Sequence, residues 1–449
     1  MSSLMRSVSG IRGIIGESLT PENIIRHVYA FATQLTGKDV VLGGDPRTSN
    51  TFIRPLVKSV LISRGINVID IGITPTPTVQ IAVEKLKTAG GLAITASHNP
   101  IEWNGVKFIG ADGLFLPQDA INKLFEAADD TKRKYAGWKS LGKEDMYSNA
   151  IDDHLEKIYS LPYINVEQIR KKKFKVGLDC VNGAGGLIIP KLLEHFGCEI
   201  VGLNLEPTGI FAHTPEPLPQ NLKDLAKLVR ENNCDIGFAV DPDVDRCAII
   251  GNDGNPLGEE YTLATAVKFI LSQKLGHVVI NLSTSRAIDE IVQYYNSVLH
   301  RTKVGEINVA EKMRQIDAVI GGEGNGGVIL PDVHLGRDAP VAVALTLQQL
   351  AEFDGTIAQF KQTLPQYYIL KDKAPVGKVD PDKVIERFSE LFKCEQLNSV
   401  DGLRIDHSDY WIHLRKSNTE PIMRIIVEAR TPEKSWQILQ QTKETISKL

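Results

Sequence analysis

Short apolar runs alternate with segments of helical apolar spacing along most of this chain, and this alternation limits its possible folds more than any other feature. In the first third, residues 38–43, 67–71 and 92–95 are predicted strands, whereas residues 51–64 and 79–88 place apolar side chains at helical intervals. Alternating strands and helices favour a parallel or mixed sheet covered on both faces. We therefore predict an α/β domain at the start of the chain.

The same alternation returns in the middle of the chain. Beyond residue 154, strands are expected at 174–179, 199–203 and 235–240, with helices between them at 187–196 and 222–232. A third block of the same kind follows residue 254. Three consecutive α/β units of similar size therefore stand in a row, although we find no repeat at the level of individual residues.

The last block, from about residue 370, differs because its predicted strands follow one another. Strands at 402–405, 410–414 and 423–428 lie between helices at 381–392 and 432–447, which predicts an antiparallel α+β domain. A chain of 449 residues also exceeds what one core usually supports. We predict three α/β domains with mixed sheets and a smaller C-terminal α+β domain, at residues 1–153, 154–254, 255–369 and 370–449.

Composition and charge argue against several classes of function. The formal charge of −4 gives no long-range attraction to nucleic acid or to an anionic membrane, and no apolar run approaches the length that spans a bilayer. Residues 1–10 lack an apolar core with basic flanks, so we expect no secretory signal. The five cysteines form no Cys-x-x-Cys pair. We expect a cytoplasmic protein without nucleic-acid or membrane partners.

A candidate nucleophile lies in Thr95-Ala96-Ser97-His98-Asn99-Pro100, directly after a predicted strand. Pro100 removes a backbone donor and biases Asn99 away from helix, so the strand must give way to a loop. This places Ser97 at the carboxyl edge of the predicted sheet, where open α/β folds bind ligands. A serine there can act as a nucleophile if a neighbour activates it. The hexapeptide alone is equally compatible with a loop serine that only satisfies backbone groups.

Three carboxylates at alternate positions, Asp241, Asp243 and Asp245, follow another predicted strand. An EF-hand would need Gly and Glu where Arg246 and Asn252 stand, so that interpretation fails. A phosphatase with an aspartyl nucleophile fits the third carboxylate poorly. Three carboxylates packed after a buried strand repel one another unless a cation compensates them. We favour Mg²⁺, whose shell is completed by phosphate oxygen or water.

Two further loops carry polar groups suited to a sugar phosphate. The stretch Arg415-Lys416-Ser417-Asn418-Thr419-Glu420-Pro421, with Arg424 beyond it, offers guanidinium, hydroxyl and amide donors that suit a phosphate dianion, or alternatively a capped turn. In the glycine-rich stretch 321–327, Glu323 and Asn325 can bind neighbouring sugar hydroxyls. Taken alone, that stretch is better explained as a hairpin turn.

Two cationic residues are weaker candidates. Lys107 lies ten positions beyond Ser97 and can return toward it across a hairpin. It would serve as general acid/base if burial or other cations lowered its pKa; an ordinary surface lysine is the alternative. Arg12 is flanked by glycines and is uninformative alone.

Four of these stretches together carry a specific resemblance. TASHNP, DPDVDR, GEGNGG and RKSNTEP occur in that order, one in each predicted domain, and over essentially its whole length the chain closely resembles the α-D-phosphohexomutase superfamily. The resemblance implies four domains around a deep cleft. It implies that Ser97 is a phosphoserine and Asp241, Asp243 and Asp245 are Mg²⁺ ligands together with an oxygen of that phosphoserine. By the same resemblance Lys107 is the general acid/base.

The resemblance also assigns the remaining residues. Arg12, His98 and Arg246 are expected to be charged neighbours of Lys107, and Glu323 and Asn325 to bind sugar hydroxyls. The non-reacting phosphate would be held by Arg415, Ser417, Asn418 and Thr419, followed by Arg424. Because the last domain would supply this phosphate site to a cleft, we expect hinge rotation near Leu370.

The implied reaction converts a hexose 6-phosphate to a hexose 1-phosphate through a bound hexose 1,6-bisphosphate. Asn325 and Gly327 stand where Ser and His are more familiar, so the sugar is not fixed, but Glu420 resembles the phosphoglucosamine mutase branch. Phosphoglucomutase/phosphomannomutase activity is the alternative. A metal-dependent sugar-phosphate phosphatase and a non-catalytic sugar-phosphate-binding protein are further ones. We expect a monomer or homodimer with a small-molecule sugar phosphate as its partner.

Overall fold

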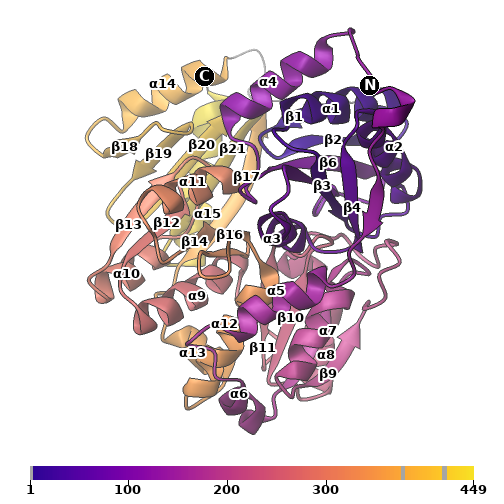
Figure 1. Ribbon diagram of the computed structural model, residues 1–449. Helices are drawn as coiled ribbons and strands as arrows, with labels where there is room; N and C mark the ends of the chain where they lie inside the picture. The colour runs from indigo at the N-terminus through magenta and orange to yellow at the C-terminus, as the bar shows by residue number, and fades with distance from the viewer. Residues whose placement is uncertain (1–3, 376–379, 417–421, 449) are drawn as a thin grey trace.

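Four sheets follow one another along the chain (Figure 1). The computed structural model describes residues 4–375, 380–416 and 422–448. The first three sheets mix parallel and antiparallel pairs and are packed with helices, and the fourth is antiparallel. The predicted fold class, three α/β units and a smaller α+β unit, is confirmed.

The first sheet has seven strands in the order β1-β2-β6-β5-β3-β4-β7. Its strands are β1 (Met5–Ser7), β2 (Gly10–Ile14), β3 (Asp39–Gly44), β4 (Asn67–Ile73), β5 (Gly90–Ile94), β6 (Trp103–Gly110) and β7 (Glu144–Met146). Its helices are α1 (Pro21–Gln34), α2 (Asn50–Ser63), α3 (Thr76–Leu86) and α4 (Gln118–Asp129). The polar segment after α4 runs along the sheet edge and adds β7 in parallel to β4.

The second sheet has the strand order β11-β10-β8-β9. Two helices, α5 (Ala150–Tyr159) and α6 (Val166–Lys172), lead into it. The sheet and its helices then comprise β8 (Lys175–Asp179), α7 (Gly185–His195), β9 (Glu199–Leu203), α8 (Lys223–Glu231), β10 (Ile236–Val240) and β11 (Cys247–Gly251).

The third sheet has the order β13-β12-β14-β15-β16. Its elements are α9 (Glu259–Gln273), β12 (His277–Asn281), α10 (Ala287–Tyr294), β13 (Val298–Thr302), α11 (Glu306–Gln315), β14 (Ile320–Glu323), β15 (Gly327–Leu330), β16 (His334–Arg337), α12 (Ala339–Glu352) and α13 (Ile357–Gln362). The second and third sheets share one hydrophobic core, which includes most of the buried side chains of α9 and α12.

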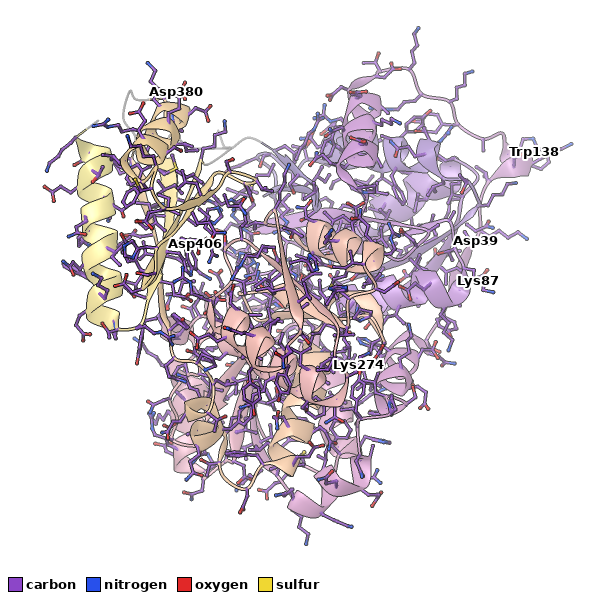
Figure 2. The ribbon with its side chains drawn as sticks, turned by 90° about the vertical axis from the view of Figure 1, so that its left-hand side faces the viewer. Asp39, Lys87, Trp138, Lys274, Asp380 and Asp406 are labelled. Carbon is purple, nitrogen blue, oxygen red and sulfur yellow. The ribbon has the colours of Figure 1, made fainter. Side chains whose placement is uncertain are left out.

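The fourth sheet, in the order β17-β21-β20-β19-β18, has a core of its own. Its elements are β17 (Tyr368–Pro375), α14 (Pro381–Leu391), β18 (Gln396–Asn398), β19 (Leu403–Asp406), β20 (Tyr410–Lys416), β21 (Ile422–Ala429) and α15 (Pro432–Ser447). Both helices begin with a capping Asp or Thr followed by Pro, a combination that favours a helix start. Figure 2 shows this unit, with Asp380 and Asp406, on the flank opposite Trp138.

One arrangement recurs in the first three sheets and positions the candidate site. A strand with a parallel neighbour is followed by a strand antiparallel to it: β5 by β6, β10 by β11, and β14 by β15. The connections between these pairs overlap the stretches singled out above, which we call the serine loop (residues 95–100), the acidic loop (241–246) and the glycine loop (321–327, which includes the end of β14 and the first residue of β15). Among the described residues, no helix is long and apolar enough to cross a membrane.

Candidate active site

Ser97 lies in the serine loop at the carboxyl end of β5, as predicted. Its Oγ donates a hydrogen bond to Asp241 Oδ2 at 2.9 Å, and the residue is 1% exposed. Its backbone has φ +52°, a left-handed conformation that is uncommon for residues other than glycine. The Ser97 amide donates to Thr95 Oγ1 at 2.8 Å. The left-handed backbone of Ser97 and the hydrogen bond of its amide therefore hold the hydroxyl against the acidic loop.

Arg47 holds the serine loop in place through hydrogen bonds to its backbone. Sequence reasoning missed this residue. All five N–H groups of this buried guanidinium are used. Nε donates to Asp45 Oδ2, and Nη1 and Nη2 donate to four carbonyl oxygens of the segment after β5, at Ser97, Asn99, Pro100 and Trp103, with distances of 2.6–2.8 Å. The turn Asp45-Pro46 after a buried strand repeats the Asp241-Pro242 turn, and this similarity is the signal that points to Arg47.

The three predicted carboxylates meet. Asp241, Asp243 and Asp245 are buried and each offers an oxygen within 4.8 Å of the others. Asp243 Oδ1 and Asp245 Oδ1 are buried and accept no hydrogen bond from any described residue. Thr76 at the start of α3 donates from Oγ1 to Asp243 Oδ2 at 2.6 Å. Buried carboxylate oxygens without donors suit a hard cation, so this donor set fits Mg²⁺.

The pKa values of Asp241 and Asp245 in the acidic loop are shifted in opposite directions. Burial, reinforced by the Asp245 and Asp243 charges, raises the pKa of Asp241 well above its usual range. Burial also acts to raise the pKa of Asp245, but Arg337 and Lys107 outweigh it and hold that pKa below its usual range. Asp245 is therefore ionised, whereas Asp241 keeps a proton more readily.

Lys107 reaches this cluster from β6, where it lies opposite Ala93 of β5. Its Nζ donates to Asp243 Oδ2 at 2.6 Å and to Asp245 Oδ2 at 3.3 Å. The hairpin return is thus confirmed, but the lowered pKa on which an acid/base role depended is not found. Burial does act to lower the pKa of Lys107, and the two aspartates outweigh it and raise the pKa.

Arg12, His98 and Arg246 surround the serine and acidic loops. Arg12 Nη1 donates to Asn99 Oδ1 at 3.3 Å. Arg246 and His98 both face Glu216, at 3.5 and 3.8 Å. Burial and the charges of Arg246 and Arg12 lower the pKa of His98 to about 2. His98 is therefore neutral at neutral pH, which differs from the charged neighbour that the resemblance implied.

The glycine loop joins β14 to β15, so it is a hairpin turn as well as a candidate sugar site. Glu323 is buried, with Oε1 accepting from Asn281 Nδ2 and the Gly305 amide. Asn325 Oδ1 accepts from the Gly327 amide at 3.2 Å. Glu323 and Asn325 line a cavity of about 270 Å³, and its other polar walls come from all four sheets, including Arg12, Arg246, Glu306, Arg337 and Arg415.

A second cavity of about 580 Å³ adjoins the first and shares Lys371, Arg415 and Ile426 with it. Arg415 on β20 and Arg424 on β21 lie directly opposite each other in the antiparallel register and both line this cavity. The predicted phosphate ligands Ser417, Asn418 and Thr419 lie outside the described residues. Arg415 therefore faces the cavity that Glu323 and Asn325 line, whereas Arg424 faces the adjoining one.

Sequence reasoning missed Arg337, Glu306 and Lys371 in these walls. Arg337 Nη2 donates to Asp245 Oδ2 at 2.6 Å and Nη1 donates to Glu323 Oε2 at 2.8 Å. Lys371 Nζ donates to Glu259 Oε1 at 2.6 Å and to the Gly324 carbonyl at 3.2 Å. Each contact joins residues far apart in sequence, so no local pattern marks it.

Comparisons with known proteins agree with this fold. Phosphoglucomutase/phosphomannomutase α/β/α domains I, II and III match residues 4–134, 152–254 and 258–368. A phosphoglucomutase/phosphomannomutase of Thermococcus kodakarensis is 36% identical over 443 residues, covering 96% of each chain. A probable phosphoglucosamine mutase of Methanopyrus kandleri is 35% identical over 437 residues, covering 96% of this chain and 95% of the relative.

Solved structures share the fold. A phosphoglucomutase/phosphomannomutase family protein of Burkholderia thailandensis has a TM-score of 0.84 at 25% identity, covering 99% of this chain and 98% of its own. A putative phosphomannomutase of Thermus thermophilus has a TM-score of 0.85 at 23% identity and full coverage of both chains (100% each), which shows the fold alone. The resemblance seen in four loops thus extends over the whole length of the chain, which belongs to the phosphoglucomutase/phosphomannomutase family of the α-D-phosphohexomutase superfamily and is an intramolecular phosphotransferase of the phosphohexomutase kind.

Proposed function

We propose that this enzyme interconverts a hexose 6-phosphate and a hexose 1-phosphate through a phosphorylated Ser97 and a bound hexose 1,6-bisphosphate, with Mg²⁺ as its cofactor. The observation that carries the proposal is the 2.9 Å hydrogen bond between the Ser97 hydroxyl and Asp241 of the acidic loop. As an alcohol, Ser97 contacts one of the three carboxylates through this hydrogen bond. As a phosphoserine, it would share a divalent cation with them.

Asp241, Asp243 and Asp245 would hold the cation, and the two buried oxygens without donors are the observation that favours this role. When bound, Mg²⁺ would neutralise charge on the transferring phosphoryl group. Thr76 and the first turn of α3 orient Asp243, since Thr76 donates through both its hydroxyl and its amide to that residue. Arg47 fixes the carbonyl of Ser97 and therefore the direction of its side chain.

Lys107 would handle the proton of the attacking or departing sugar hydroxyl. The residue is 1% exposed, and its ammonium donates to Asp243 and Asp245. Any further positive charge at those carboxylates weakens their hold on the ammonium proton, which favours its release to a sugar oxygen. Arg12 and Arg246 add positive charge on the cavity side, where the phosphoryl oxygens would pass.

A mutase also needs a second site that holds the phosphate not being transferred. Arg415 and Arg424 face the adjoining cavity and would provide it together with Ser417, Asn418 and Thr419. Glu323 and Asn325 would bind sugar hydroxyls between the two ends. A bisphosphate that turns around between these sites presents either phosphate to the serine.

We propose glucosamine 6-phosphate and glucosamine 1-phosphate as the preferred pair, with glucose or mannose phosphates as the alternative. Relatives bearing both kinds of name match over the full length at nearly equal identity. The support for glucosamine is Glu420 in the phosphate loop. Specificity constants for glucosamine, glucose, mannose and N-acetylglucosamine phosphates, measured side by side, decide between them.

Ser97→Ala is the direct test of the mechanism. We expect this variant to lose turnover by several orders of magnitude and to take up no phosphoryl group from a hexose 1,6-bisphosphate, as followed by intact mass. Ser160→Ala, at the exposed end of α5, should behave as the parent. Retained mutase activity in Ser97→Ala overturns the mechanism. Release of inorganic phosphate in place of isomerisation would identify the phosphatase alternative, and an unphosphorylated, inactive parent would identify a binding protein.

A further inference from the structure

Arg337, the last residue of β16, joins the acidic loop to the glycine loop through one guanidinium. Its Nη2 donates to Asp245 Oδ2 at 2.6 Å and its Nη1 to Glu323 Oε2 at 2.8 Å. Its Nε donates to Glu306 Oε2 at 3.0 Å, and the residue is 8% exposed. Carboxylates from three separate segments therefore converge on a single buried cation.

In the part of the chain that the structure describes, this cation has no substitute at two of the three carboxylates. Within the described residues, Arg337 is the one basic side chain in ion-pair contact with Glu323 and with Glu306, whereas Asp245 also contacts Lys107. All three carboxylates are buried. Removing the guanidinium would leave Glu323 and Glu306 as unpaired charges that repel each other and Asp245.

Packing and backbone bonds hold Arg337 in this place. A Cβ at Gly327 would lie 2.3 Å from Arg337 Cδ, so the glycine loop has room for the arginine stem because residue 327 lacks a side chain. The next two residues are also bonded: the Asp338 amide donates to the carbonyl of Val328 in β15, directly after the glycine loop, and the Ala339 amide donates to the carbonyl of Val244 in the acidic loop. Val244 has φ +62°, a strained value that persists only when its surroundings fix it.

We propose that Arg337 is a positioning residue that couples the metal site to the sugar site. The inference rests on the proposed metal site. A cation bound to Asp245 changes how strongly that carboxylate competes for the guanidinium, and the same guanidinium holds Glu323 in the glycine loop. Occupancy of the acidic loop would thereby order the glycine loop, and by thermodynamic reciprocity an ordered glycine loop would strengthen cation binding.

Hydrogen exchange of the full-length protein, with Mg²⁺ as the only added probe, tests this without depending on the identity of the sugar. In the parent, Mg²⁺ should slow exchange in residues 241–246 and also, by about five-fold or more, in residues 320–330. In Arg337→Met, protection of 241–246 should remain while the slowing in 320–330 is lost. Arg337→Lys should lose it too, because an ammonium lacks the fork that bridges two carboxylates.

Arg286→Met is the matched control. Arg286 is also partly buried and pairs with Asp406, but it contacts neither loop. It should leave the Mg²⁺-dependent slowing in residues 320–330 intact. Equal slowing in the parent and in both Arg337 variants overturns the coupling, as does slowing confined to 241–246 in the parent. If Mg²⁺ protects no residue of 241–246 in the parent, the proposed metal site fails and this inference fails with it.

Discussion

Replacing Arg47 should impair catalysis without touching the substrate site. Arg47→Met keeps the aliphatic stem and removes the guanidinium that holds four carbonyls of the segment after β5. Arg47 is 1% exposed and is not among the residues that line the two cavities. We therefore expect a loss in kcat, an unchanged KM for the sugar phosphate, and a less stable protein.

The magnitudes follow from the contacts. Asp45 would remain buried without its cation, which costs about 3–5 kcal/mol for the broken pair. Ser97 would lose the bond that opposes relaxation of its left-handed backbone, a conformation that costs about 1–2 kcal/mol in a non-glycine residue. A displacement of the nucleophile by about 1 Å lowers the rate by roughly 100-fold. Arg47→Met should therefore show kcat reduced by about two orders of magnitude.

Steady-state kinetics and chemical denaturation of the same preparations measure both effects. Arg54→Met is the control, because Arg54 also pairs with a buried aspartate, Asp70, but donates to no carbonyl of the serine loop. It should lower stability and leave kcat within about two-fold of the parent, since misplacement of the nucleophile is what lowers kcat. An Arg47→Met protein with parental kcat would refute the positioning argument, whatever its stability. A raised KM with unchanged kcat would place Arg47 in substrate binding instead.

Two further predictions concern stability. Burial lowers the pKa of His27 to about 4, so the folded protein keeps this ring neutral where the unfolded chain takes up a proton near pH 6.5. The unfolding free energy should consequently rise with pH between about 4 and 6.5, by up to about 3 kcal/mol from this group, and denaturation of His27→Gln should show a correspondingly flatter dependence. A Cβ at Gly186 would lie 1.7 Å from the Leu205 carbonyl oxygen, so Gly186→Ala should lose about 1–3 kcal/mol of unfolding free energy. Gly137→Ala, with open space around it, should change little; equal losses in both glycine variants would contradict the packing argument.

The acidic loop could be predicted because its chemistry is local. Asp241, Asp243 and Asp245 stand at alternate positions of one turn, so spacing alone suggested that they converge, and they do. Arg337 could not be found in this way. Its partners Asp245 and Glu323 lie 92 and 14 positions away in the sequence, and no pattern in the residues around Arg337 predicts these contacts. The pKa of Lys107 was mispredicted for the same kind of reason: Asp243 and Asp245, which lie more than a hundred positions away in sequence, outweigh burial and raise it.

No strand ranges are predicted from the sequence for β6 and β11, which follow the serine loop and the acidic loop, and the reason is again tertiary. β11 is buried at every position and β6 at all but its two ends, so neither shows the alternation that marks a strand with one face in solvent. Both became strands because a neighbour was available, since β10 and β5 each have a free edge after their parallel pairing. Tertiary pairing therefore decided both elements.

The distribution of cores over the four sheets suits the proposed reorientation of a bisphosphate intermediate. The second and third sheets share one core, and Arg337, Thr76 and Lys107 join the acidic loop to the first and third, so the groups around Ser97 are fixed relative to one another. The fourth sheet has a separate core and meets the third largely through polar contacts, such as Arg286 with Asp406 and the Val304 amide with Asp401. Polar contacts of this kind exchange for water at small net cost, unlike a continuous apolar core. Rotation near Leu370, at the start of β17, would therefore move Arg415 and Arg424 without disturbing Ser97, as release and reorientation of the proposed bisphosphate intermediate would require.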